Sequence, residues 1–85
     1  MIDLIINEYI KKMSPTDIKI FAKYNQIELS DNESQYLLII VKKNWRTILY
    51  GNPKDLFEKI RRDNTSDLYQ KSQVLFKAIQ DKFRR

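Results

Sequence analysis

Tyr36–Val41, with the sequence YLLIIV, is an uninterrupted apolar run near the middle of the chain. A segment that is apolar on every side must be buried on every side, and six residues would also suit a buried strand. The flanking residues decide between helix and strand. Ser30 is followed three residues later by Glu33, the reciprocal pair that caps a helix start, and no turn-forming residue appears before Asn44. The run therefore predicts a long central helix, because an element of more than about a dozen residues exceeds a typical strand.

Amphipathic helices are expected on the N-terminal side of this central helix. Residues 2–13 carry apolar side chains at helical spacing. Residues 14–17, with the sequence SPTD, then start a second helix, because a serine cap, a proline in the first turn and an early aspartate suit a helix N-terminus. The second helix has two apolar faces, one with Ile18, Phe21 and Ala22 and the other with Ile20, Tyr24 and Ile27. We expect each face to contact a neighbouring helix.

Two residues are expected to shape the end of the central helix. Asn44 should bend or break it, since asparagine tolerates the left-handed conformation that ends many helices. Gly51 is the only glycine and is expected to take a positive φ before the next helix. Asn52 then serves as a predicted cap, with Pro53 as the first helical residue.

The C-terminal third predicts two more helices, the second with apolar residues at steps of three and four from Leu68 to Phe83. The predicted fold is all-α, a compact bundle of five or six short helices around a buried central helix at about residues 31–50. A length of 85 residues fits one domain, so residues 1–85 are expected to form a single helical domain.

The composition argues against catalysis and metal binding. The chain has no cysteine and no histidine, which removes thiolate sites, the common Ser-His and Cys-His pairs, and the commonest transition-metal ligand. Asp55 and Glu58, like Asp63 and Asp67, lie near helix starts, where acidic residues are expected for electrostatic reasons. We therefore predict a protein that is not an enzyme, with no catalytic, cofactor-binding or metal-binding residues and no small-molecule substrate.

The N-terminus lacks the basic start and long apolar core of a signal peptide, and no apolar run reaches the roughly 20 residues of a membrane span. These features predict a cytoplasmic protein without membrane association. Abundant isoleucine, lysine and asparagine suggest AT-rich codons and a bacterial source.

Positive charge is concentrated in the C-terminal half. Residues 1–41 carry four basic and six acidic side chains, whereas residues 42–85 carry twelve basic and five acidic ones, within a total net charge of +5. The candidate surface for nucleic acid or another anion consists of Lys42, Lys43, Arg46, Arg61 and Arg62. Ordinary solvating charge is the alternative explanation. The apolar character of the central helix and the acids at its start argue against its use as a recognition helix.

Aromatic residues point to another function. One Trp, five Tyr and four Phe are many for a core of this size, and Tyr and Trp are enriched at protein interfaces. The candidate interface aromatics are Tyr24, Trp45 and Tyr50, with a core position as the alternative for Trp45. We therefore predict a protein–protein interaction module or homo-oligomer, with nucleic-acid binding as the alternative.

Several motifs together resemble a known family. They are SPTD at residues 14–17, SDNE at 30–33, the distinctive WRTILYGNP at 45–53 and YQK at 69–71. With these motifs the chain resembles a family of uncharacterised small helical proteins of bacilli. The resemblance implies an all-helical domain without an assigned activity, so it supplies no catalytic or binding residue.

Overall fold

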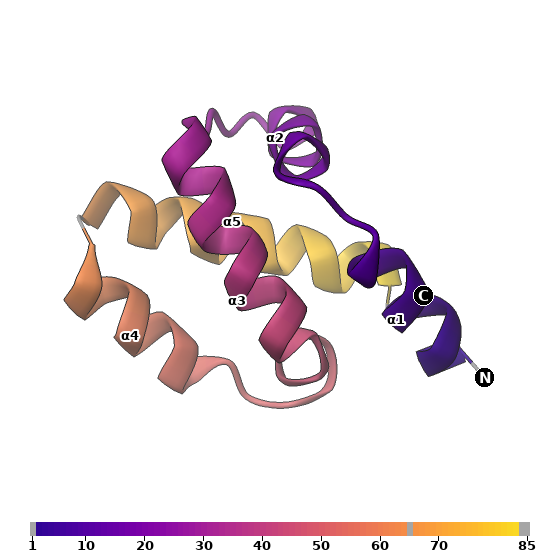
Figure 1. The fold of residues 1–85 in the computed structure, drawn as a ribbon. Coiled ribbons are helices and arrows are strands. Elements are labelled where there is room, and N and C mark those ends of the chain that lie inside the picture. Colours follow the sequence, from indigo (N-terminus) through magenta and orange to yellow (C-terminus); the bar gives the residue numbers. More distant parts are fainter. Residues whose placement is uncertain (1, 65, 84–85) are drawn as a thin grey trace. The chain divides into compact units, whose positions relative to one another are not determined.

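The computed structural model describes residues 2–64 and 66–83, which form five helices and no strand (Figure 1). The helices are α1 (Ile2–Lys11), α2 (Pro15–Tyr24), α3 (Asp31–Tyr50), α4 (Lys54–Asp63) and α5 (Ser66–Phe83). The all-α fold class is confirmed. The chain divides into two compact units, residues 1–45 and residues 46–85. The single domain over residues 1–85 stays a prediction.

Two helix starts follow the predicted capping pattern. The Ser14 hydroxyl accepts from the Asp17 amide at 3.2 Å, and the Asp17 carboxylate accepts from the Ser14 amide at 2.9 Å. Ser30 and Glu33 form the same reciprocal pair at the start of α3, with distances of 3.1 and 2.9 Å. Each pair satisfies two amides that have no partner within the helix, so α2 and α3 begin where the sequence predicts.

Asparagine side chains occupy three helix ends or breaks. The Nδ2 atoms of Asn25, Asn44 and Asn64 each donate to the carbonyl oxygen four residues earlier, at Phe21 (2.9 Å), Ile40 (3.0 Å) and Ile60 (3.3 Å). Asn25 and Asn64 follow the last residues of α2 and α4. Asn44 lies within α3 at a non-helical φ of −128° and ψ of 20°. The predicted break at Asn44 is therefore confirmed, although its conformation is not left-handed.

The left-handed residue of the first unit is Gln26, with a φ of 63°. Its amide donates to the Lys23 carbonyl at 3.0 Å, and the Ile27 amide donates to the Ala22 carbonyl at 2.9 Å. These two bonds form the Schellman motif that ends many helices, usually with glycine at the left-handed position. The motif turns the chain sharply after α2 and leads the buried Ile27 and Leu29 into the connection to α3.

The prediction of a positive φ at Gly51 is wrong, because the structure has no positive-φ glycine. The Gly51 amide donates to the Thr47 carbonyl at 3.0 Å, so the residue continues the helical bonding of α3. A Cβ atom at this position would lie 3.3 Å from both the Cα and the carbonyl oxygen of Thr47. Glycine is therefore favoured at position 51 by the close approach of the Thr47 backbone, and not by a left-handed backbone conformation.

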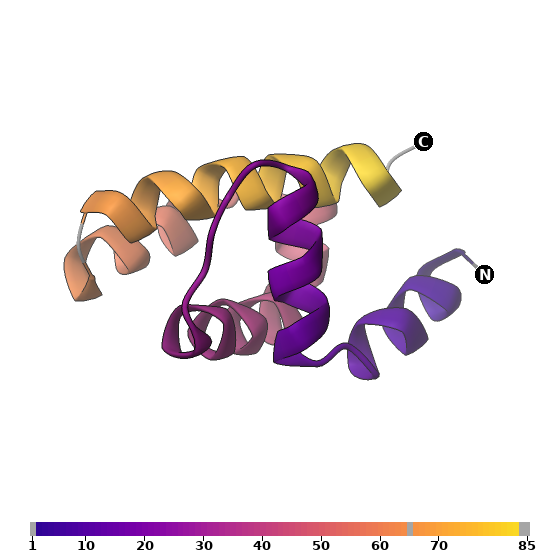
Figure 2. The same cartoon turned by 90° about the horizontal axis from the view of Figure 1, so that it is seen from above.

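The first unit contains α1, α2 and residues 31–45 of α3, and α2 runs crosswise to α3 (Figure 2). Ile39 of the central run is 57% exposed, so the expectation that the run is buried on every side is wrong at this residue. The helix turns Ile39 away from the side on which Leu37 and Val41 are fully buried. The buried apolar residues of the unit are Ile6, Ile10, Ile18, Ala22, Ile27, Leu29, Leu37, Leu38, Ile40, Val41 and Trp45.

In the second unit, α4 and α5 pack against each other in opposite directions (Figure 1). Phe57 stacks on Phe76 with ring centroids 5.4 Å apart, and it meets the edge of Tyr69 at 6.2 Å. Helix α4 begins one residue later than predicted, because Pro53 lies at the cap position. The Asn52 side chain nevertheless accepts from the Lys54 amide at 3.1 Å, which is the kind of hydrogen bond expected of the predicted cap. The buried apolar residues of this unit are Ile48, Leu49, Ile60, Leu68, Leu75, Phe76 and Ile79.

Candidate interaction surfaces

The outer side of α2 exposes an apolar pair. Ile20 is 51% exposed and Tyr24 is 81% exposed, whereas Ile18 and Ala22 are buried on the other side of the helix. The expectation that both faces of α2 contact neighbours is therefore wrong for Ile20 and Tyr24, although Ile27 is buried. A hollow of about 320 Å³ lies beside the pair and is lined by Ile20, Lys23 and Tyr24. We call these three residues the α2 outer face.

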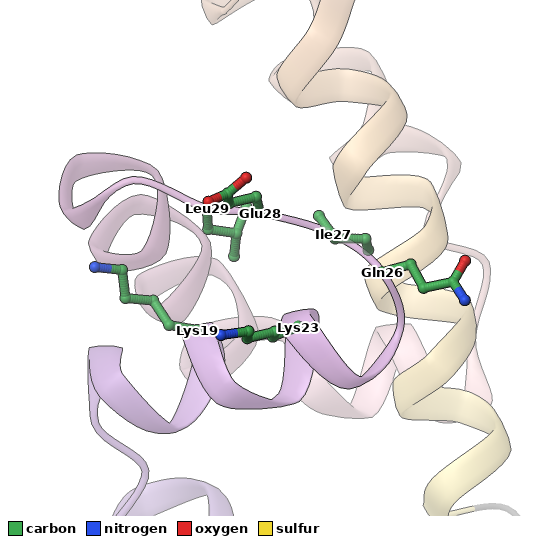
Figure 3. Close-up of a pocket in the computed structure, with 6 residues that line it drawn as sticks. All are labelled: Lys19, Lys23, Gln26, Ile27, Glu28 and Leu29. Carbon is green, nitrogen blue, oxygen red and sulfur yellow. The ribbon is translucent and has the colours of Figure 1, made fainter.

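A second hollow lies between α2 and the connection to α3 (Figure 3). Its volume is about 440 Å³, and its lining consists of Lys19, Lys23, Gln26, Ile27, Glu28 and Leu29. The two lysines project from α2 below the connecting segment. Lys23 lines both hollows, so it links the α2 outer face to this second hollow. No sequence motif predicts this hollow, because the hollow depends on the turn that the chain makes at Gln26.

Lys19, which lines this hollow, forms an ion pair with Asp31 at the start of α3. The Lys19 ammonium donates a hydrogen bond to the Asp31 carboxylate and also attracts its charge, and both effects hold the pKa of Asp31 below its usual value. Lys19 therefore has its ion-pair partner within the same chain, whereas Lys23 is exposed and lines both hollows.

Helix α1 also exposes apolar side chains. Ile5 is 71% exposed and Tyr9 is 48% exposed, whereas Ile6 and Ile10 are buried. Glu8, which precedes Tyr9, is exposed as well. The spacing of residues 2–13 predicts an apolar helix face, but it does not reveal that part of this face remains in contact with solvent.

Each predicted interface aromatic has a different degree of exposure. Tyr24 belongs to the α2 outer face, and Tyr50 is exposed in the last turn of α3. Trp45 is only 4% exposed, as expected for the alternative position in the core. Tyr24 is therefore the predicted aromatic that lies beside a hollow and next to an exposed lysine.

The predicted basic residues are exposed but belong to separate units. Lys42 and Lys43 lie on α3 in the first unit, whereas Arg46, Arg61 and Arg62 belong to the second. Arg61 and Arg62 are in the last turn of α4, where cations are favoured by the helix dipole. The arrangement of all five residues on one face stays a prediction.

A further hollow in the second unit has a volume of about 340 Å³ and contains the stacked Phe57 and Phe76 in its lining. Among residues 2–64 and 66–83, no group of three or more acidic side chains is placed to hold a metal ion. In the same part of the chain, no helix combines the length and the apolar character that crossing a membrane requires.

The chain matches no protein-family model, no curated protein and no solved structure. The resemblance to the small helical proteins of bacilli therefore stays a prediction.

Proposed function

We propose that this protein is a non-catalytic protein–protein interaction module that binds another chain through the α2 outer face. The observation that carries the proposal is the exposure of Ile20 and Tyr24, one helical turn apart, beside a hollow and an exposed lysine. Residues spaced by four along a helix are the usual anchors when one helix docks on another chain. Tyrosine is also among the residues that contribute most at interfaces.

The size of this face limits the affinity that it provides alone. Full burial of an aliphatic or aromatic side chain contributes about 1.5–3 kcal/mol, and Ile20 is already half covered. Association also costs translational and rotational freedom, of at least about 4 kcal/mol. The α2 outer face therefore supports a weak contact, or one part of a larger interface.

The direct test is a variant that removes both anchors, Ile20→Ser with Tyr24→Ser. Val74→Ser is the control, because it removes an exposed apolar side chain from the second unit. The tagged parent and both variants are compared by chemical cross-linking and by co-purification from the source cell, and circular dichroism verifies the helical content of each. The proposal expects a stoichiometric partner, either a second copy or another protein, that the double variant loses and the control retains. A parent that binds no chain, or a double variant that binds as the parent does, would contradict it.

Nucleic-acid binding is the second candidate, because Lys42 and Lys43 are adjacent and exposed on α3. If this is the function, binding to mixed DNA and RNA weakens as salt rises, with about 0.9 in the log–log slope for each phosphate contact on duplex DNA. Exchanging both lysines for glutamine would then reduce binding to all sequences alike and flatten the slope. Under the interaction proposal, this exchange leaves partner binding unchanged.

A bacterial, cytoplasmic setting belongs to the same proposal. Its support is the residue usage of the chain and the absence of a spanning helix among the described residues.

A further inference from the structure

The exposed faces of α1 and α2 share one pattern of side chains with opposite charge. Residues 5–9 read IINEY and residues 20–24 read IFAKY. In each segment the isoleucine and the tyrosine are exposed one turn apart, and an exposed charged residue precedes the tyrosine. That residue is Glu8 in α1 and Lys23 in α2. We call Ile5, Glu8 and Tyr9 the α1 outer face.

We propose that the α2 outer face of one copy binds the α1 outer face of a second copy. This inference rests on the proposed function, since it names the occupant of the surface already assigned to partner binding. Both faces belong to the first unit, so every copy carries both halves of the contact.

An antiparallel arrangement of the two helices matches the side chains. With the centres of the two segments opposed, Ile5 faces Tyr24 and Tyr9 faces Ile20. Each isoleucine thus covers a tyrosine ring, a pairing of flat and branched apolar surfaces. In this register residues 5–11 of α1 oppose residues 18–24 of α2, and three residues of each helix extend beyond the contact.

The charges complete the match. Glu8 and Lys23 stand three residues after their isoleucines, so both lie on the same flank of the apolar pair. When two helices pack antiparallel, a local twofold axis between them places the same flank of each apolar pair on the same side of the contact. Glu8 and Lys23 therefore lie on one side of it. In this register the two residues differ by two positions along the helix axis, which is about 3 Å at 1.5 Å per residue. The side chains of glutamate and lysine easily span that offset.

The same geometry disfavours the two symmetric alternatives. Pairing α2 with a second α2 would bring Lys23 against its own copy, and pairing α1 with a second α1 would do the same for Glu8. Like charges across a contact are repulsive, so they select against these pairings. The mixed α1–α2 contact is the one of the three in which the charges attract. It forms twice in a closed twofold dimer or continues head to tail, and both forms raise the mass with concentration.

Charge reversal tests the contact in the full chain. Sedimentation and light scattering across a concentration series compare the parent, Glu8→Lys, Lys23→Glu and the double reversal, at low and moderate salt. Each single reversal is expected to weaken self-association about five- to tenfold, because it replaces an attraction with a repulsion. The double reversal is expected to restore it to within about twofold of the parent. Lys59→Glu, at an exposed position of α4, is the charge control and should leave association close to that of the parent.

Two results would overturn the inference. One is a parent that stays monomeric at every concentration tested. The other is a double reversal that associates no better than the single variants. If the parent stays monomeric and the Ile20→Ser with Tyr24→Ser variant loses a different protein partner that Ile5→Ser with Tyr9→Ser keeps, the proposed function stands and the self-contact fails. If both variants keep that partner, the proposed function is contradicted instead.

Discussion

Lys19, in the middle of α2, forms an ion pair with Asp31, the first residue of α3, and so links these two helices directly. The contact is exposed, with the Asp31 side chain more open to solvent than that of Lys19. It lowers the pKa of Asp31, first through the hydrogen bond from Lys19 and second through the charge of the ammonium.

The Lys19–Asp31 pair predicts a specific pH dependence of stability. Because the folded-state pKa of Asp31 is lowered, the pair stabilises the fold at pH values above the ordinary aspartate pKa. This contribution is lost as the pH falls through the lowered folded-state value. Lys19→Met should therefore unfold slightly more easily than the parent at neutral pH, and the difference should disappear in acid and at high salt. Urea titrations at several pH values measure it, with Lys12→Met as the matched control.

Replacement of Gln26 by glycine should stabilise the protein. Gln26 has a φ of 63° at the end of α2, and left-handed geometry costs a residue with a side chain about 1–2 kcal/mol. We expect Gln26→Gly to raise the free energy of unfolding by about 1 kcal/mol in denaturant titrations. Gln70→Gly, at an exposed position inside α5, should lower it by a similar amount. A Gln26→Gly variant less stable than the parent would count against the Schellman motif.

Two neighbouring isoleucines of α3 should differ in how strongly their replacement by aspartate destabilises the protein. Ile40 is buried and Ile39 is 57% exposed. Ile40→Asp should unfold the protein, because an unpaired buried carboxylate costs several kcal/mol, comparable to the total stability of a small domain. Ile39→Asp should keep its cooperative thermal transition, with a small shift in Tm. Equal melting of the two variants would show that α3 presents a different side to the core.

Substitutions at Gly51 test the backbone handedness of this residue. Alanine and asparagine add the same Cβ atom beside Thr47, so at a helical φ Gly51→Ala should be tolerated better than Gly51→Asn, because alanine is the better helix former. If the residue needed a positive φ, asparagine would be the better replacement. Thermal melting of the two variants decides the order, and the expected difference is about 1 kcal/mol. An asparagine variant more stable than the alanine variant would restore the left-handed interpretation.

The helix starts were predictable because they depend on a few adjacent residues. Ser14 with Asp17, and Ser30 with Glu33, bond within one turn, so the sequence alone contains the whole interaction. The break at Asn44 is local in the same way, since its amide reaches the Ile40 carbonyl. The start of α4 shifted by one residue because proline can also stand at the cap position.

The exposed surfaces could not be predicted by the same reasoning. Helical spacing shows that α2 has apolar residues on two sides, but it does not show which side a neighbour covers. Ile20 and Ile27 look alike in the sequence, yet Ile27 is buried by the turn at Gln26 and Ile20 is exposed. The pattern shared by residues 5–9 and 20–24 can be seen in the sequence. Only the structure shows that the isoleucine and the tyrosine of both segments are exposed.

Deamidation of the asparagines at the helix ends and at the break in α3 would remove hydrogen bonds that end or interrupt a helix. Each side-chain amide of Asn25, Asn44 and Asn64 donates to a carbonyl oxygen. Deamidation turns asparagine into aspartate, which replaces the donor with a negatively charged acceptor facing that oxygen. The change would also place the new charge at the negative end of a helix dipole for Asn25 and Asn64. Each such change would thus destabilise the helix end, or the break in α3, at which that amide donates its hydrogen bond.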